Sequence, residues 1–258
     1  MTNSAVVLRT EGLTKSFQGF VAVQDVDFAV ERGHIHAVIG PNGAGKTTFF
    51  NLLTKFLSPT HGRIFYKDED ITGLKPAQIA RRGVVRSFQI SATFPHLTVV
   101  ENVRVALQRK LGVTYHFWRS EESLRVLDER AHELLAEVGL ESFAQLQAVE
   151  LPYGRKRALE IATTIALDPE LILLDEPTQG MGHEDIDRVK SLIKRVAEGR
   201  TVLMVEHNMS VVASIADTIT VLQRGATLAE GPYEVVSKDP AVIEAYMGSA
   251  QVELKGAH

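Results

Sequence analysis

The sequence predicts an α/β fold with a mostly parallel central sheet covered by helices and an inserted helical region. Apolar strand patterns and helix patterns alternate along most of the 258 residues, which is the order expected for a parallel sheet with helices on its faces. A glycine-rich segment joins one of these strands to a helix near residue 40. Between about residue 90 and residue 150 only helix patterns occur.

The first part of the chain predicts several strands and the start of the parallel sheet. Phe20–Val30 alternates apolar and polar residues with one slip, which indicates a strand with a bulge. His34–Ile39 predicts a buried strand that leads into the glycine-rich segment. The other elements expected here are strands at Val6–Leu8, Arg63–Tyr66 and Val84–Phe88, helices at Lys46–Phe56 and Pro76–Arg82, and a turn at Pro59–Gly62.

The middle of the chain predicts a helical insert. Thr98 followed by Glu101 has the form of a capping box, which opens a helix. A longer helix is expected to end at Gly139. Because no strand pattern interrupts these helices, we expect Ile90–Glu150 to form a separate subdomain inserted into the core.

Strands and helices alternate again after the insert. The expected strands are Leu171–Leu174, Thr201–Val205, Thr218–Gln223 and Thr227–Glu230, and the expected helices are Gly154–Leu167, Glu184–Ala197 and Met209–Ile215. We therefore divide the chain into residues 1–89 (first part of the core), 90–150 (helical subdomain), 151–248 (the rest of the core, with a C-terminal helix) and 249–258 (a polar tail expected to fray).

The glycine-rich segment fits the phosphate-binding pattern G-x-x-x-x-G-K-[ST] and predicts a nucleoside triphosphate site. Glycines let successive backbone N–H groups point at one anion, and the start of the helix adds partial positive charge. Lys46 would reach the outer phosphates, and the Thr47 hydroxyl would bind magnesium. A glycine-rich turn with a chance lysine is the alternative. The residues expected to hold the phosphates are Gly40, Pro41, Asn42, Gly43, Ala44, Gly45, Lys46, Thr47 and Thr48.

Polar residues that suit phosphate chemistry follow two later strands. Behind a phosphate-binding loop, Asp175 would hold magnesium through water and Glu176 would polarise the attacking water. Two solvated acids at an ordinary strand end are the alternative. His207 follows the strand Thr201–Val205 and is either a structural or exposed histidine or a hydrogen-bond partner of the γ-phosphate.

A basic segment, Leu151–Arg157, comes directly before a predicted helix and the strand that ends in the two acids. Gly154, at the helix start, offers backbone donors and the positive end of the helix dipole to an anion. The alternative is a basic loop that only starts a helix.

The order of these motifs resembles that of the ATP-binding-cassette ATPases, and the resemblance covers about Leu8 to Gly248. It implies a P-loop NTPase with a RecA-like nucleotide-binding core, whose first part, residues 1–89, includes an antiparallel β-subdomain. It also implies ATP and Mg²⁺ as cofactors, and ATP hydrolysis. Leu151–Arg157 resembles the signature segment of that family. The resemblance implies catalytic roles for Gln89, Glu176 and His207, magnesium binding by Thr47, Gln89 and Asp175, adenine stacking by Phe17, and nucleotide contacts by Tyr153, Gly154 and Arg155.

Further segments are similar to the ATPase subunits of branched-chain amino-acid-type importers. They are Arg86–Gln89, Leu97–Val103, the Tyr153-Gly154 pair, Glu244–Gly248 and the long insert around Trp118. The resemblance implies a second cassette, identical or related, so that each ATP lies between one P-loop and the other signature. It also implies membrane permease subunits that contact the insert, where Phe94 or Trp118 would be either anchors or core residues, and indirectly a solute-binding protein.

Three residues depart from the family pattern. Pro152 replaces the usual signature serine and has neither hydroxyl nor N–H. Arg155 replaces a glutamine and either brings charge to the phosphates or faces solvent. Gly182 replaces an acidic or amide residue after the catalytic glutamate. These departures leave open a chain that binds ATP at an impaired composite site and is mainly structural or regulatory.

Composition argues against several other classes of protein. The net charge of −4 does not favour a nucleic-acid partner, and the absence of cysteine excludes disulfides and thiolate metal sites. No apolar run approaches the ~18 residues of a transmembrane helix, so nothing in the sequence is expected to span a bilayer. The resemblance implies a peripheral protein at the cytoplasmic face of the inner membrane. A soluble cassette protein of DNA repair or translation is the other alternative, although the chain has neither paired cassettes nor a coiled-coil insert.

Overall fold

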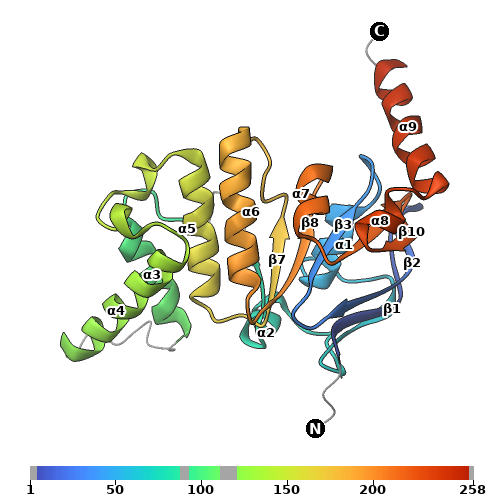
Figure 1. Cartoon of the computed structure of the whole chain (residues 1–258). Helices are drawn as coiled ribbons and strands as arrows, with labels where there is room; N and C mark the ends of the chain where they lie inside the picture. Colours follow the sequence, from blue (N-terminus) through green and yellow to red (C-terminus); the bar gives the residue numbers. More distant parts are fainter. Residues whose placement is uncertain (1–4, 88–92, 111–120, 256–258) are drawn as a thin grey trace.

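A six-stranded sheet forms the centre of the computed structural model, which describes residues 5–87, 93–110 and 121–255 (Figure 1). Its strand order is β10-β9-β3-β8-β7-β6. Five of these strands are parallel to one another: β9, β3, β8, β7 and β6. Only the edge strand β10 is antiparallel, to β9. The bounds are β3 Ile35–Ile39, β6 Val84–Ser87, β7 Leu171–Asp175, β8 Thr201–Val205, β9 Thr218–Gln223 and β10 Ala226–Gly231. The predicted mostly parallel sheet is therefore confirmed.

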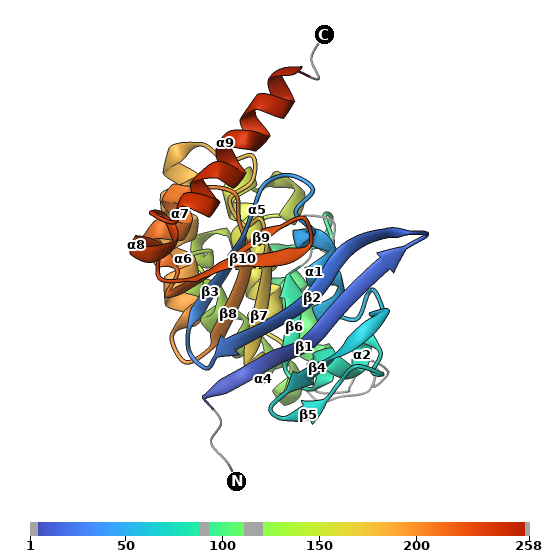
Figure 2. The same cartoon turned by 90° about the vertical axis from the view of Figure 1, so that its right-hand side faces the viewer.

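A second, antiparallel sheet has the order β2-β1-β4-β5, as Figure 2 shows. Its strands are β1 Val6–Phe17, β2 Phe20–Glu31, β4 His61–Tyr66 and β5 Glu69–Asp70. The pairing of β1 with β2 shifts register between Leu13 and Lys15, which pair with Val26 and Val23, and this extra residue in β2 confirms the predicted bulge. The expected strand Val6–Leu8 is too short, because β1 continues through polar residues that pair with β2 and β4 on its two sides.

Helices cover both faces of the central sheet. They are α1 Lys46–Leu53, α2 Pro76–Arg81, α3 Val99–Lys110, α4 Glu121–Glu137, α5 Tyr153–Ile165, α6 His183–Ala197, α7 Met209–Ile215, α8 Tyr233–Val236 and α9 Pro240–Lys255, with 3-10 turns η2 Glu141–Phe143 and η3 Ala148–Glu150. Lys55 has a positive φ of 61°, and α1 ends before it, earlier than expected. α9 runs on into the segment 249–258, which was expected to be a tail.

The central sheet separates two apolar cores. Leu171 and Leu173 of β7 pack with α1 and the antiparallel sheet, whereas Ile172 and Leu174 pack with α5, α6 and α7. This alternation follows from the two-residue period of a strand that is buried on both faces. Because the strands are parallel, the ends of β3, β7 and β8 meet at one edge of the sheet.

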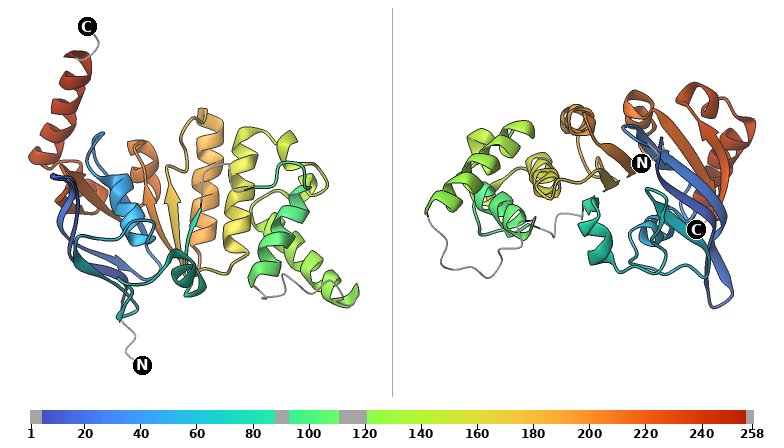
Figure 3. Two further views of the ribbon diagram at one scale, coloured as in Figure 1. Left: turned by 180° about the vertical axis from the view of Figure 1, so that it is seen from behind. Right: turned by 90° about the horizontal axis from the view of Figure 1, so that it is seen from below.

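The insert lies beyond α5, on the side of the molecule opposite the antiparallel sheet (Figure 3). Its first helix begins with the predicted capping box: Thr98 N–H donates to Glu101 Oε2 at 2.7 Å, and Glu101 N–H donates to Thr98 Oγ1 at 3.3 Å. Val103, Leu107 and Leu135 of the insert join the core that also contains α5. A displacement of the insert would therefore be transmitted first to α5.

Candidate nucleotide site

The glycine-rich loop connects β3 to α1 and has no space for side chains at two of its glycines. Gly40 and Gly45 have positive φ values of 152° and 98°. A Cβ on Gly40 would lie 2.2 Å from the carbonyl oxygen of Leu222, and one on Gly45 would lie 2.3 Å from that of Ala22. Since these neighbours are backbone atoms that cannot move aside, the loop conformation requires glycine at both positions.

Lys46 is the first residue of α1, and its ammonium lies against the loop. Nζ donates to the carbonyl oxygens of Gly40 at 2.7 Å and Pro41 at 3.1 Å. Burial lowers the pKa of Lys46, and the Glu176 carboxylate acts in the opposite direction. The first turn of α1 holds no acidic residue. A buried ammonium, a helix N-terminus and backbone without Cβ atoms fit a polyphosphate.

Asp175 ends β7 and forms an ion pair with Arg86 of the neighbouring strand β6. Both side chains are mostly buried, with 16% of Asp175 and 11% of Arg86 exposed. The Arg86 guanidinium also donates to Asn51 Oδ1 of α1 at 2.6 Å. Asp175 is therefore held in a fixed orientation toward the loop side of the sheet. Sequence analysis assigns no role to Arg86 itself, although the strand alternation places it on the face toward α1.

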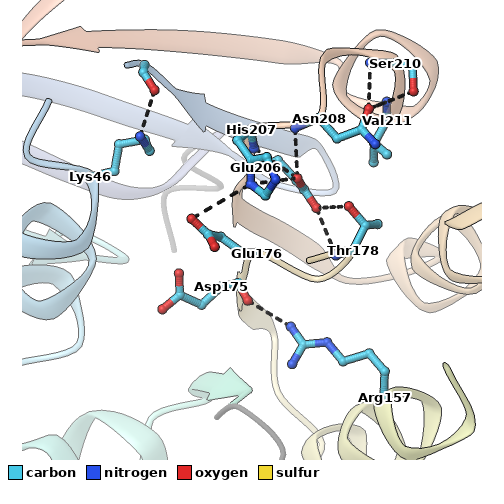
Figure 4. A network of polar contacts seen from close by, with 11 residues as sticks. Lys46, Arg157, Asp175, Glu176, Thr178, Glu206, His207, Asn208, Ser210 and Val211 are labelled. Carbon is cyan, nitrogen blue, oxygen red and sulfur yellow. Dashed lines mark hydrogen bonds and ion pairs between the residues drawn. The ribbon is translucent and has the colours of Figure 1, made fainter. Parts of the chain in front are cut away.

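Glu176 follows in a left-handed conformation, with φ 44°. Its N–H donates to the carbonyl oxygen of Val205 at 2.9 Å, which ties it to the end of β8. His207 Nδ1 lies 4.0 Å from Glu176 Oε1, and the two side chains face each other in Figure 4. Non-glycine residues occupy this backbone region rarely and at an energetic cost, so the surroundings must impose it.

A fully buried carboxylate, Glu206, ties together the loops that follow β7 and β8. Oε1 accepts hydrogen bonds from Thr178 N–H at 3.0 Å and Thr178 Oγ1 at 2.5 Å. Oε2 accepts from the N–H groups of His207 at 2.9 Å and Asn208 at 3.1 Å. Sequence analysis missed this residue, because its role depends on the neighbouring position of two loops that are distant in the chain.

The predicted signature segment begins α5, with Pro152 at the N-cap. The Tyr153 hydroxyl donates to the carbonyl oxygen of Gln179 at 3.1 Å, in the loop before α6. A Cβ on Gly154 would lie 2.8 Å from the Asp185 carboxyl carbon of α6. Arg155 Nη1 donates to the carbonyl oxygen of Gly139 at 2.8 Å, and the guanidinium carbon lies 5.0 Å from the centre of the Phe143 ring. Arg155 is thus engaged with the insert of its own chain.

The structure gathers some of the predicted site residues and separates others. Lys46, Asp175, Glu176 and His207 lie together at one edge of the sheet (Figure 4). The start of α5 belongs to the opposite face of the sheet from α1. Phe17, at the end of β1, is 41% exposed. Gln89 and Trp118 lie outside the described residues.

This fold and this edge of the sheet define a P-loop ATPase. Residues 23–179 match the family described as "ABC transporter", and residues 226–251 match "Branched-chain amino acid ATP-binding cassette transporter". The chain belongs to the ATP-binding-cassette transporter family. It is therefore an ATPase coupled to transport, and the family, the fold class and the activity predicted from the sequence are confirmed.

Two relatives are similar over almost the whole chain. It is 43% identical to the high-affinity branched-chain amino acid transport ATP-binding protein BraF of Pseudomonas aeruginosa, with 96% of this chain and 100% of the relative covered. It is 40% identical to the corresponding protein LivG of Escherichia coli K12, with the same coverage of 96% and 100%.

Solved cassettes have the same fold. The ADP conformation of MJ1267, a cassette of an ABC transporter, has a TM-score of 0.82 at 30% identity, covering 95% of this chain and 100% of that chain. A dimeric post-hydrolysis state of the cassette MJ0796 bound to ADP and Pi has a TM-score of 0.73 at 25% identity, covering 87% of this chain and 98% of that chain.

Proposed function

We propose that this chain hydrolyses ATP with Mg²⁺ to drive the import of a small polar solute, a branched-chain amino acid or a related amide. The observation that carries the proposal is the gathering of Lys46, Asp175, Glu176 and His207 around one phosphate loop (Figure 4). The solute class is supported by the names of BraF and LivG, which align with the chain over 96% of its length.

The proposed roles follow from position and chemistry. Lys46 and the N–H groups of Gly40–Thr48 bind the outer phosphates, and Phe17 stacks on adenine. Thr47, Gln89 and, through water, Asp175 hold Mg²⁺, which when bound neutralises charge on the phosphates. Glu176 orients the attacking water and accepts its proton. His207 donates a hydrogen bond to the γ-phosphate.

We assign Tyr153, Gly154 and Arg155 to the ATP of a second cassette. The start of α5 belongs to the opposite face of the sheet from α1, so the segment suits a nucleotide bound by another chain. The dimeric MJ0796 structures support such an arrangement. Pro152 does not remove a donor from the first turn, because it lies at the N-cap and the N–H groups of the following residues remain.

The helical subdomain, residues 90–150, would receive the permease subunits. Two of its segments pair in antiparallel fashion: Val149 N–H donates to Pro95 O at 2.9 Å, and Val99 N–H donates to Leu146 O at 2.9 Å. Along these segments Phe94, Leu146 and Val149 are 52%, 43% and 48% exposed. Exposed apolar side chains that gather on one surface mark interaction sites.

The permease partners place the chain at the cytoplasmic face of the membrane. Within the described residues, we find no helix with the length and apolar character to cross a bilayer. A solute-binding protein would contact the permease subunits rather than this chain.

Turnover of the assembled transporter tests the proposal. Glu176→Gln should lower kcat by about 10²-fold or more, because an amide cannot accept the proton of the attacking water. The matched control is Glu198→Gln, a change in an exposed carboxylate at the end of α6. Turnover that survives in Glu176→Gln would show that the assigned mechanism is wrong.

A further inference from the structure

Helix α5 contains a buried ion pair that the proposed roles above do not use. Arg157 Nη1 donates to Glu160 Oε2 at 2.5 Å, and the side chains are only 6% and 2% exposed. Among the described residues, Arg157 Nε and Glu160 Oε1 have no hydrogen-bond partner. Buried ion pairs with unsatisfied atoms contribute little to stability, since desolvation offsets the attraction. Burial accordingly raises the pKa of Glu160, although Arg157 acts in the opposite direction.

The second contact of Arg157 leads directly to the ATPase site. Nη2 donates to the main-chain carbonyl oxygen of Asp175 at 3.0 Å (Figure 4). That oxygen belongs to the peptide group that joins Asp175 to Glu176. The N–H of the same peptide donates to the carbonyl oxygen of Val205 at 2.9 Å. Both polar atoms of this peptide are therefore fixed, one by α5 and the other by the end of β8.

We propose that Arg157 is a positioning residue, which orients the peptide between Asp175 and Glu176 and so aims the catalytic carboxylate. The inference rests on the proposed role of Glu176 as the base. Directly after this fixed peptide, Glu176 has a left-handed backbone, with φ 44°, a conformation that non-glycine residues adopt rarely. Glu160 keeps the guanidinium of Arg157 in place from the same helix.

The position of Arg157 in α5 adds a link between two ATP sites. Arg157 lies about one helical turn after Gly154, on the helix that begins with the signature segment. A helix moves as a rigid rod over this distance, so a shift of its first turn also shifts the guanidinium. Contact of the signature segment with ATP on a second cassette would then adjust Glu176 in the first.

The variants must separate positioning from folding. Arg157→Met alone leaves the Glu160 carboxylate buried and unpaired, which endangers folding. The double variant Arg157→Met/Glu160→Leu removes both charges and keeps the volume apolar. We expect a melting temperature within a few degrees of the wild type, ATP affinity and KM changed by less than about 2-fold, and kcat lowered by about 10²-fold, the loss typical of a misplaced catalytic group.

Two further variants test the geometry. Arg157→Lys keeps the positive charge but replaces the two donating nitrogens of the guanidinium by one, so it should recover part of the kcat that the double variant loses. The matched control is Arg200→Met/Glu137→Leu, because Arg200 likewise pairs with a carboxylate, at 2.9 Å, and donates to a main-chain carbonyl, that of Val196 at 3.1 Å, away from the site. The control should keep wild-type kcat.

Steady-state turnover and ATP titration of all variants, measured beside Glu176→Gln, decide the matter. If Glu176→Gln keeps its turnover, the proposed function itself fails. If Glu176→Gln loses turnover but Arg157→Met/Glu160→Leu keeps it, only the role of Arg157 is overturned. A double variant that loses ATP binding as strongly as kcat would likewise overturn it, because Arg157 would then serve the structure of the whole site.

Discussion

The P-loop and the signature segment both face phosphate groups in the proposed mechanism, but they are built in different ways. In the P-loop, backbone contacts exclude any side chain at Gly40 and Gly45, and Lys46 is buried against the loop carbonyls. In the signature segment Tyr153 is 46% exposed, and Arg155 bonds to the insert. The first half-site is complete within one chain, whereas the second acquires its function only against another cassette. Substitutions in the P-loop should therefore impair ATP binding by the single chain, whereas substitutions in the signature segment should change only hydrolysis by the assembled transporter.

The largest expected effect is on binding by the single chain. Lys46→Ala removes a buried ammonium that no neighbouring group replaces, and it should weaken ATP binding by about 10²-fold or more, equivalent to about 3 kcal/mol. Titration of the purified chain with a fluorescent ATP analogue measures this. Lys194→Ala, in the last turn of α6, is the matched control and should bind normally. Equal affinities of the two variants would contradict the assignment of the loop.

The strand that leads into the P-loop should make the core sensitive to acid. His36 of β3 is buried, and its Nε2 lies 2.8 Å from Thr220 Oγ1. Burial, assisted by His34, lowers the pKa of His36 from 6.5 to about 4. Between these values the unfolded chain binds the proton and the folded chain does not, so stability falls as the pH drops from about 6.5 to about 4. The loss is about 3 kcal/mol.

Urea unfolding at pH 7 and pH 4 measures this loss of stability. His36→Gln should lose about 3 kcal/mol less free energy of unfolding over this interval than the wild type, because glutamine does not titrate. An identical pH dependence in both proteins would show that His36 does not carry it. His183→Gln, which changes a histidine at the start of α6, should behave like the wild type.

Arg86 tests how the magnesium carboxylate is held within the first half-site. Loss of a group that orients a metal ligand typically costs about 10-fold to 100-fold in metal affinity. We expect Arg86→Met to raise the Mg²⁺ concentration for half-maximal ATP binding by about 10-fold while ATP binding in EDTA is unchanged. A lower Mg²⁺ requirement would mean that the guanidinium competes with the metal for Asp175 instead of orienting it.

The smallest effect is expected at the signature. Pro152→Ser should change coupled hydrolysis by less than about 3-fold, because the altered residue is the N-cap and the donors of the first turn are unaffected. Serine at the N-cap should raise stability by up to about 1 kcal/mol. A gain in turnover of 10-fold or more would instead favour a composite site that Pro152 impairs.

Local patterns predicted several short elements of the core. The bounds of β8, β9 and α7 coincide with the predictions, since an apolar run or a short helix pattern determines them. β1 was predicted too short, because pairing with two neighbouring strands extends it through polar residues. The P-loop was predicted because its chemistry lies in consecutive residues.

The positioning residues were not predicted because their partners are distant in sequence. Arg86 acts on Asp175 through the β6–β7 pairing, and Glu206 joins the loops after β7 and β8. The sequence pattern places Arg157 in a basic segment that suits an anion, whereas only 5% of the residue is exposed and its guanidinium contacts the main chain of Asp175. A charge pattern alone does not distinguish a basic surface from a buried guanidinium.

The central claim is that each ATP site is formed by the P-loop of one chain and the signature segment of another. Mixing two inactive variants tests this claim most directly. Lys46→Ala disables the P-loop, and Tyr153→Asp places a carboxylate at the start of α5 that repels phosphate. In a mixed pair one site combines the two intact halves, so the mixture should hydrolyse ATP well above the sum of the separate variants. Turnover equal to that sum would contradict a site shared between two copies of the chain.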